Sequence, residues 1–357
     1  MMNRLIFIVL SLCVFTQIGC ASNPLDGPLV TLNVTVFEDS GMPLEGAVVT
    51  GGFRSKDTGT PAAIGETDQL GKASIRGHVP FGSVRLIVNK EGYYTNTFKR
   101  IYTTDRNLSE LAPRSRDVKT TLRQIMTPVP LIAKHVENVQ IPVKGEWVGY
   151  DLELGDWVEP HGNGERVDLR FRYSNKFLGY RMNEPKLSEG IKVAKRLTEN
   201  RGEEWTEEKQ KHFFGKWSGD LEISFPGEKE GILAVTESNG YLAESELRMP
   251  HLAPEEGYAA SISWNDVRNG QFMPKNGNGF FLRVRVRERN DQILEANYAK
   301  INLRPYGTAH DGLRFDPRGE VSFSYYFNPN VNDRNLEFDP KKNLLQNLDR
   351  DEQVKLP

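Results

Sequence analysis

The sequence predicts an all-β protein made of two antiparallel β-sandwich domains, of which the second is larger, jelly-roll-like and carries a short helical insert. Alternating apolar and polar residues recur in short runs along the chain, as is typical of half-buried strands. Glycine (32 residues) and proline (20 residues) are frequent enough to supply many turns between such strands. The length of 357 residues corresponds to roughly two domains.

The first alternating run follows Pro28, where Leu32, Val34 and Val36 are separated by polar residues. A turn is expected directly after it at 39–41, because the glycine tolerates positive φ and the aspartate bonds its own backbone. The elements then follow in a specific order: D-x-G-x-P-L-x-G-A at 39–47, T-D-x-x-G at 67–71 and K-x-G-Y at 90–93.

This order resembles the carboxypeptidase regulatory-like domain, a transthyretin-like β-sandwich. The resemblance covers about residues 30–99, and we assign 30–126 to this domain. It implies a disulfide-free spacer or binding module without peptidase chemistry, in which the motif residues serve as scaffold. A fold by itself implies no function.

A proline-stiffened bridge at 126–130 leads to the second predicted domain, residues 127–340. Each of its alternating runs has one apolar and one polar face, which predicts antiparallel sheets on a shared core. The clearest runs are 167–173, 221–225, 280–286 and 321–327. Thr206 is expected to cap a helix, 188–196 to form another, and 341–357 to be a C-terminal arm.

From Pro130 onward the chain is similar to uncharacterised bacterial exported proteins in which a second β-domain follows the regulatory-like one. The runs Y-D-L-E-L-G-D-W and N-D-R-N-L-E-F-D-P-K-K-N-L carry this similarity. This similarity implies no known activity.

The first 19 residues have the pattern of an export signal. Arg4 precedes an apolar run at 5–15, which is too short for a membrane span of about 20 residues. Gly19 precedes Cys20, and this resembles the lipobox of bacterial lipoproteins, although Gln17 stands where the family usually has Leu. The alternative is an ordinary signal peptide cut near Ala21.

The lipobox resemblance implies that Cys20 is lipidated and anchors the mature chain to a membrane through a tether at 20–29. Cys13 lies inside the signal, so Cys20 is then the only cysteine of the mature chain and no internal disulfide forms. The protein is expected to be exported and held at the bacterial cell envelope. The residue after the cysteine is Ala21 rather than Asp, which in the family points to the outer membrane.

The bulk charge and the motifs narrow the range of functions. Lys plus Arg (46) nearly balance Asp plus Glu (48), which argues against nucleic acid as a partner. The chain has no H-E-x-x-H, G-x-S-x-G, P-loop or C-x-x-C motif. No cofactor is therefore expected, and the six histidines have no metal-ligand spacing.

The most distinctive polar stretch is 149–165, which contains Asp151, Glu153, Asp156, Trp157 and His161. Paired carboxylates beside a tryptophan platform suit saccharide binding, or glycoside cleavage if the carboxylates flank a cleft. The alternative is a strand, a turn and a strand with solvated acids and a core tryptophan. Trp147 and Trp264 are further candidates for an exposed aromatic platform.

Two other stretches have both a functional and a structural interpretation. Residues 328–339 echo a calcium loop but lack its glycine and its bidentate glutamate, so Asx-type turns are the better account. Arg283, Arg285 and Arg287 are expected on one strand face, where they either bind an anionic polymer or pair with neighbouring acids.

The leading functional hypothesis is a lipid-anchored binding or structural protein of the cell envelope, without catalysis, that binds a polysaccharide or an envelope protein. The alternative is a polysaccharide hydrolase or lyase that uses the acidic residues near 151–165. A third hypothesis is a component of an envelope assembly.

Overall fold

The computed structural model describes residues 29–53, 62–79, 84–98, 115–268, 279–302 and 313–357. The predicted signal peptide, Cys20 and nearly all of the tether lie outside these residues. The contacts divide the chain into two units, one drawn from 1–36, 43–87 and 98–119 and the other from 37–42, 88–97 and 120–357. The prediction of an all-β, sandwich-like protein is confirmed.

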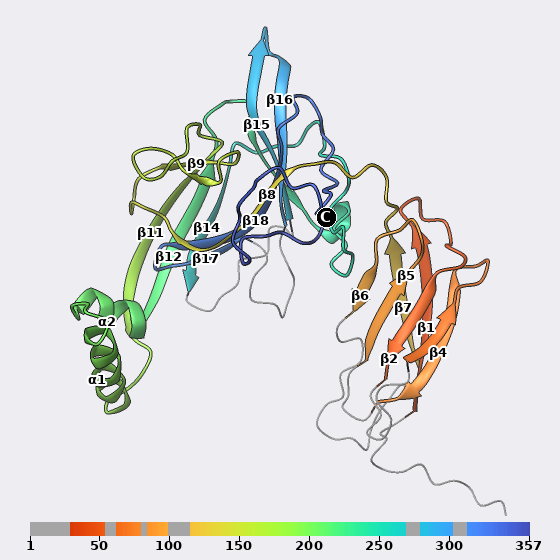
Figure 1. Cartoon of the computed structure of the whole chain (residues 1–357), viewed down its shortest axis with the longest axis horizontal. Helices are drawn as coiled ribbons and strands as arrows, with labels where there is room; N and C mark the ends of the chain where they lie inside the picture. The colour runs from red at the N-terminus through yellow and green to blue at the C-terminus, as the bar shows by residue number, and fades with distance from the viewer. Residues whose placement is uncertain (1–28, 54–61, 80–83, 99–114, 269–278, 303–312) are drawn as a thin grey trace, which may run out of the picture. The chain divides into compact units, whose positions relative to one another are not determined.

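The first seven strands form two sheets with the orders β4-β1-β7 and β3-β2-β5-β6, in which β1 pairs antiparallel with β4 and β2 pairs antiparallel with β3 (Figure 1). In β1 the apolar residues alternate with more exposed ones, as the sequence predicts. The strands are β1 (Leu29–Glu38), β2 (Val48–Gly52), β3 (Ala62–Glu66), β4 (Lys72–His78), β5 (Arg85–Asn89), β6 (Asn96–Phe98) and β7 (Ser115–Leu122).

The turn at 67–71 shows why its motif residues are needed as scaffold. One Asp68 carboxylate oxygen accepts hydrogen bonds from the backbone N–H groups of Leu70 and Lys72, both at 2.9 Å. Gly71 has a φ of +70°, and a Cβ there would lie 2.4 Å from the carbonyl oxygen of Val36. A side chain at position 71 would therefore disrupt the close approach to β1.

The second unit contains a five-stranded sheet, β10-β9-β11-β12-β14, and a six-stranded sheet in which β18 pairs with β8, β16 and β17 and continues through β15 to β13 (Figure 1). Its strands are β8 (Ile132–Gln140), β9 (Val148–Asp151), β10 (Asp156–Trp157), β11 (Leu169–Tyr180), β12 (Gly215–Ser224), β13 (Gly231–Val235), β14 (Ser261–Arg268), β15 (Gly279–Arg289), β16 (Gln292–Asn302), β17 (Arg314–Asp316) and β18 (Glu320–Asn328).

One aromatic-rich core joins these two sheets. Tyr150 of β9 and Phe171 of β11 lie against Phe323 of β18, with ring centroids 5.4 Å and 5.8 Å from the Phe323 centroid. All three side chains are buried within a single cluster of apolar residues from both sheets. This interleaving of rings is the sandwich packing that the alternating runs predict.

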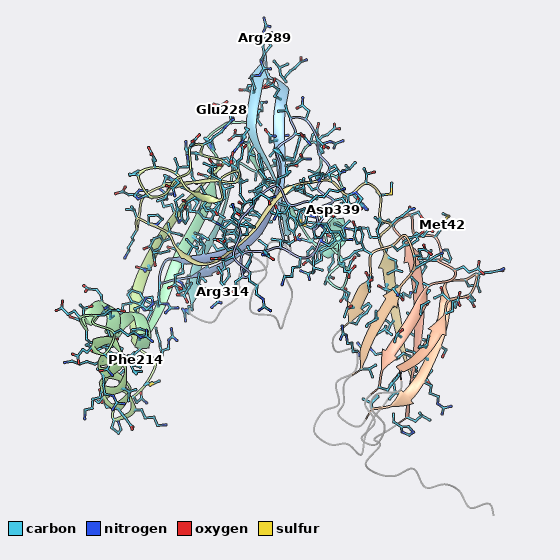
Figure 2. The ribbon with its side chains drawn as sticks, in the orientation of Figure 1. Met42, Phe214, Glu228, Arg289, Arg314 and Asp339 are labelled. Carbon is cyan, nitrogen blue, oxygen red and sulfur yellow. The ribbon has the colours of Figure 1, made fainter. Side chains whose placement is uncertain are left out.

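The helical insert lies between β11 and β12 and consists of α1 (Lys186–Glu199) and α2 (Glu207–Phe214). Thr206 caps α2, because its hydroxyl oxygen accepts a hydrogen bond from the Lys209 N–H at 3.2 Å. Both predicted helices are confirmed. Phe214 marks the place where the chain returns to β12 (Figure 2).

The six-stranded sheet departs from the expectation of one apolar and one polar face. Eight of the nine residues of β18 are buried, so both of its faces are covered. A second cluster, which we call the outer core, includes Phe281, Tyr298, Tyr326 and Phe338 and lies on the face opposite the main core. The connection that follows β13 passes through the single-turn helix η1 (Glu237–Asn239) and then contributes Tyr241 and Met249 to it, and the segment after β18 contributes Leu336 and Phe338.

The C-terminal segment 341–357 extends this outer layer along β8. The Leu344 N–H donates to the Leu131 carbonyl at 2.9 Å, and the His135 N–H donates to the Glu352 carbonyl at 2.8 Å. The Tyr326 hydroxyl reaches the Leu356 carbonyl at 3.1 Å. The predicted arm is thus hydrogen-bonded to the second unit along its length.

Candidate functional site

Asp151, a predicted ligand residue, organises the loop between β9 and β11. One of its carboxylate oxygens accepts the backbone N–H groups of Glu153 and Leu154, at 2.8 and 3.2 Å. The other accepts those of Glu165 and Arg166, both at 3.0 Å. This buried carboxylate therefore holds two turns in place through backbone bonds.

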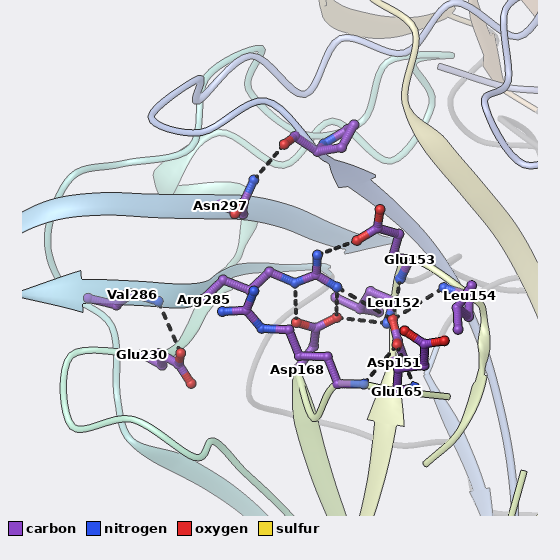
Figure 3. A network of polar contacts seen from close by, with 12 residues as sticks. Asp151, Leu152, Glu153, Leu154, Glu165, Asp168, Glu230, Arg285, Val286 and Asn297 are labelled. Carbon is purple, nitrogen blue, oxygen red and sulfur yellow. Dashed lines mark hydrogen bonds and ion pairs between the residues drawn. The ribbon is translucent and has the colours of Figure 1, made fainter. Parts of the chain in front are cut away.

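Arg285 of β15 gathers the acids of this loop into one ion-pair network (Figure 3). Its guanidinium binds Asp168 in a two-pronged contact, with distances of 2.7 and 2.9 Å. It also donates to Glu153 and lies 3.4 Å from Asp151. The ring of Phe327 lies beneath the guanidinium at 4.7 Å. The predicted carboxylates do converge, but on an arginine rather than across an open cleft.

Burial by itself lowers the pKa of Arg285, but the hydrogen bonds and negative charges of Asp168 and Glu153 more than reverse this and hold the pKa above its usual value. Asp168 is fully buried and also accepts the Leu152 N–H at 2.8 Å. Every charge of this network therefore has a close partner, which is the condition for burying charged groups.

A β-bulge directs Arg285 toward these acids. The pairing of β15 with β16 shifts register between Val284 and Arg287, and Arg285 has a φ of +56°. The buried carboxylate of Glu230 accepts the Val286 N–H at 3.1 Å and the Gly227 N–H at 3.0 Å. Glu230 thus satisfies a backbone group that the bulge removes from the ladder.

The bulge corrects the expectation that the three arginines share one face. Arg285 turns to the acidic network, whereas Arg287 pairs with Glu295 on the neighbouring strand. Arg283 donates to the carbonyl oxygens of Lys229 and Glu255, at 2.8 and 2.7 Å. The three side chains therefore form no common anionic-polymer surface, and the alternative of pairing with neighbouring acids describes Arg287 alone.

The predicted aromatic platform also needs correction, because two of its three tryptophans are core residues. Trp157 and Trp264 each expose 5% of their surface. The Trp157 ring lies edge-on against Tyr150 and Phe171, at 5.2 and 5.5 Å. Trp147 is 38% exposed, but the Arg172 guanidinium lies over its ring at 4.4 Å.

His161 lies on the exposed part of the same loop, where its backbone N–H donates to the Val158 carbonyl at 3.1 Å. Asp156 accepts the backbone N–H groups of Trp157 and Asn163, at 2.8 and 2.9 Å. The structure therefore places Asp151 and Glu153 around Arg285, and His161 in a turn that Asp156 stabilises. It does not bring the four predicted ligand residues into one constellation.

Trp157 and Asp156 do line a cavity of about 330 Å³ between the β10 region and β8. The indole N–H of Trp157 is buried without a hydrogen-bond partner. The remaining lining includes four acidic residues, Glu137, Asp349, Asp351 and Glu352, and Lys134 is bound to Glu352 at 3.1 Å. We call this the loop-side cavity.

A second cavity of about 440 Å³, which we call the outer-face cavity, lies on the outer face of the six-stranded sheet. It shares His135, Glu137 and Asp351 with the loop-side cavity, so the two adjoin. Ser324 and His135 meet inside it, with the hydroxyl oxygen 2.9 Å from Nδ1. Its other lining residues are Glu246, Arg248, Asn302, Tyr326, Arg350, Gln353, Val354, Lys355 and Leu356.

Lys300 lies beside the outer-face cavity on β16 and is fully buried. It pairs in register with Tyr326, and its Nζ lies 4.5 Å from the centroid of that ring. Nζ has no hydrogen-bond partner. Burial, reinforced by the charges of Arg123 and Arg248, lowers the pKa of Lys300 to about 7, and Glu337 opposes the shift.

The loop 328–339 uses its polar side chains for its own turns. Asn328, Asp333 and Asn335 each accept the backbone N–H two residues later, at 3.0, 2.9 and 2.9 Å. Asn332 bonds the backbone at Leu294 and Ala296. Among the residues that the structure describes, no group of three or more His, Cys, Asp and Glu side chains is placed to hold a metal ion.

Sequence reasoning missed Lys300, Asn302 and Arg248 as candidate ligand residues. Lys300 has a local signal, because it is the one charged residue in the run Ala296–Ile301. Its burial depends on the outer core, which comes from distant segments and leaves no local pattern in β16.

No family model matches this chain, and no curated protein matches it. Among solved structures it is similar to 3-chlorocatechol 1,2-dioxygenase from Rhodococcus opacus, with 15% identity over 28% of this chain and 61% of that one, and a TM-score of 0.22. This chain thus spans about three-fifths of the length of that enzyme.

Two other solved structures match over most of their length. A DUF3823 family protein from Parabacteroides merdae is 7% identical over 84% of this chain and 96% of that one, with a TM-score of 0.19. A Bacteroides fragilis protein described as membrane-associated and of unknown function is 11% identical over 85% and 98%, also with a TM-score of 0.19. At such scores none of these likenesses carries an activity to this chain. Of the helices in the described residues, none is long and apolar enough to cross a membrane.

Proposed function

We propose that this protein is a lipid-anchored, non-catalytic binding protein of the bacterial cell envelope, which binds a saccharide in its second unit. The observation that carries the proposal is the pair of adjoining cavities with polar walls, which share three residues. Their volumes of about 440 and 330 Å³ lie in the range of small-molecule sites, which is about 300–1,000 Å³.

The character of the walls supports a saccharide over an apolar ligand. Hydroxyl, amide, imidazole and charged groups line the outer-face cavity, and Tyr326 supplies a ring beside them. The loop-side cavity adds the unpartnered indole N–H of Trp157 and the carboxylate of Asp156. Such alternation of donors, acceptors and aromatic surface suits a ligand with many hydroxyl groups.

The acidic network supports binding rather than hydrolysis or lyase chemistry. Asp151 is occupied by four backbone hydrogen bonds, and Glu153 is an ion-pair partner of Arg285. A glycosidase needs two carboxyl groups that face a bound sugar. Groups already committed to turns and to an arginine are poorly suited to that role.

A glycan array probed with the full chain in detergent tests the binding proposal. We expect retention of a restricted set of glycans, with their masses unchanged after incubation. Substituting Ser324→Ala in the outer-face cavity is expected to weaken retention, whereas Arg289→Gln at the far end of β15 is the matched surface control (Figure 2). Absence of binding to every glycan on the array contradicts saccharide binding, and cleavage of a retained glycan contradicts the non-catalytic role.

The anchor rests on the lipobox resemblance around Cys20 and has its own test. Mass spectrometry of the mature protein is expected to find an acylated cysteine at the N-terminus. The Cys20→Ser variant is expected to leave the membrane fraction, since several acyl chains are needed for stable anchoring. An unmodified N-terminus on membrane-free protein contradicts this part of the proposal.

A further inference from the structure

Three polar atoms beside the outer-face cavity are buried without hydrogen-bond partners in the described structure: Lys300 Nζ, Arg248 Nε and Asn302 Oδ1. Arg248 and Asn302 line the cavity. Lys300 precedes Asn302 by two positions and therefore lies on the same face of β16. Buried polar atoms are normally hydrogen-bonded, so the two exceptions on lining residues, Arg248 Nε and Asn302 Oδ1, point to groups that a ligand supplies, and the buried Lys300 amine lies behind them.

Two of these atoms belong to basic side chains, of which Arg248 is a cation and Lys300 becomes one below about pH 7, where its pKa lies, and this sets the kind of group that would satisfy them. A buried positive charge without an acceptor is unfavourable, and an oxyanion is the partner that guanidinium and ammonium groups bind best. Arg350 and Lys355 add positive charge to the lining. Glu137, Glu246 and Asp351 also line the cavity, so the lining carries charges of both signs, and the unpartnered Arg248 Nε is the group that calls for an anion.

Tyr326 links the cationic side to the rest of the cavity. Its hydroxyl accepts a hydrogen bond from Asn302 Nδ2 at 3.3 Å, which leaves Asn302 Oδ1 as an acceptor. Lys300 lies over the ring of the same tyrosine. An acceptor next to two cations suits a molecule that carries both hydroxyl groups and a negative charge.

Building on the proposed function, we infer that the outer-face cavity selects an acidic saccharide. Arg248 binds its oxyanion group, and Lys300 adds positive charge from its position over the Tyr326 ring. Asn302 Oδ1 accepts a hydrogen bond from a hydroxyl group of the saccharide. The oxyanion is a carboxylate or a sulfate ester.

Calorimetry on the full chain tests the inference with digalacturonate and its dimethyl ester, in which an uncharged methyl ester replaces each carboxylate. We expect the acid to bind at least tenfold more tightly than the ester. A sulfated disaccharide is measured in parallel, and tighter binding of one acidic form identifies the oxyanion. Inorganic sulfate alone is expected to bind much more weakly than either disaccharide.

Two variants connect the effect to the named residues. Lys300→Met and Arg248→Gln are each expected to weaken binding of the preferred acidic disaccharide at least tenfold and to leave binding of the ester unchanged. Lys300→Met keeps the side-chain length in an apolar environment, so it is expected to fold, and unfolding monitored by tryptophan fluorescence checks this. Arg289→Gln replaces an exposed arginine at the hairpin end of β15, outside the cavity lining, and this control is expected to change neither affinity.

The outcomes separate this inference from the proposed function. Equal binding of the charged disaccharides and the ester, or acid binding that survives both variants, overturns selection for an anion and leaves saccharide binding intact. Sulfate alone binding as tightly as the disaccharides overturns the saccharide part. Failure of every glycan on the array and in solution overturns both proposals.

Discussion

Two buried cations of the second unit, Arg285 and Lys300, differ in whether their charge is matched. Arg285 has Asp168, Asp151 and Glu153 as partners and lies over Phe327. Lys300 also lies over an aromatic ring, but its amine has no hydrogen-bond partner. The matched cation fixes two loops against a bulged strand, which is a structural role. The unmatched cation lies beside a cavity, and this difference is the reason to place ligand recognition there.

The largest expected effect on stability comes from removing the carboxylate partner of Arg285. Replacing Asp168 by alanine leaves a buried guanidinium without its two-pronged partner, and we expect a loss of about 3–5 kcal/mol in the free energy of unfolding. Urea unfolding followed by tryptophan fluorescence measures it. All five tryptophans lie at or after position 147, so the signal reports the second unit.

The double variant Asp168→Ala/Arg285→Met sharpens this result. Because it removes both charges, it is expected to be less destabilised than Asp168→Ala alone. A double variant that is as unstable as the sum of its two single variants would show that the two side chains act independently and would break the comparison.

The opposite sign is expected at Lys300. Lys300→Met replaces an unpartnered buried amine by an apolar side chain of similar length, and we expect the free energy of unfolding at pH 6 to rise by roughly 1–3 kcal/mol. The same urea experiment measures the gain. A loss of stability would mean that the amine has a stabilising partner and that the contrast with Arg285 is false.

The pH dependence of that gain gives a third test. The pKa of Lys300 is lowered to about 7, below the ordinary value of about 10.4 that the unfolded chain has. Between these two values the unfolded state binds more protons, so the amine destabilises fully below about pH 7, and the destabilisation fades as the pH rises toward about 10.

The difference in stability between Lys300→Met and the natural chain is therefore expected to shrink from pH 7 to pH 10. Arg123, Arg248 and Glu337 act on Lys300 in both directions, but they are present in both chains, so the difference isolates the amine. A difference that stays constant with pH would contradict a lowered pKa.

The smallest effect is expected at Arg287, two residues from Arg285. Its guanidinium pairs with Glu295 in solvent, and exposed pairs of this kind contribute little to stability. We expect Arg287→Gln to shift the unfolding midpoint only slightly. A large shift would show that exposure does not separate the two arginines as the comparison assumes.

The class of the fold follows from the amino-acid sequence alone, because the alternation of apolar residues in strands such as β1 and β11 is a property of neighbouring positions. The amino-acid sequence also predicts the Thr206 cap, which depends on a hydroxyl and a backbone N–H three residues apart. The Asx turns of 328–339 are local in the same way. In each case the interacting groups are neighbours in the chain, so the local sequence pattern is sufficient to predict the structure.

Which charged groups have a partner depends instead on contacts between segments that are far apart in the chain. Arg285 reaches Asp168, 117 positions away, because a bulge turns it from the row it shares in the sequence with Arg283 and Arg287. Lys300 becomes buried because segments after β13 and β18 fold over the outer face of its sheet. Burial and charge pairing depend on contacts between distant segments, which a strand pattern does not encode.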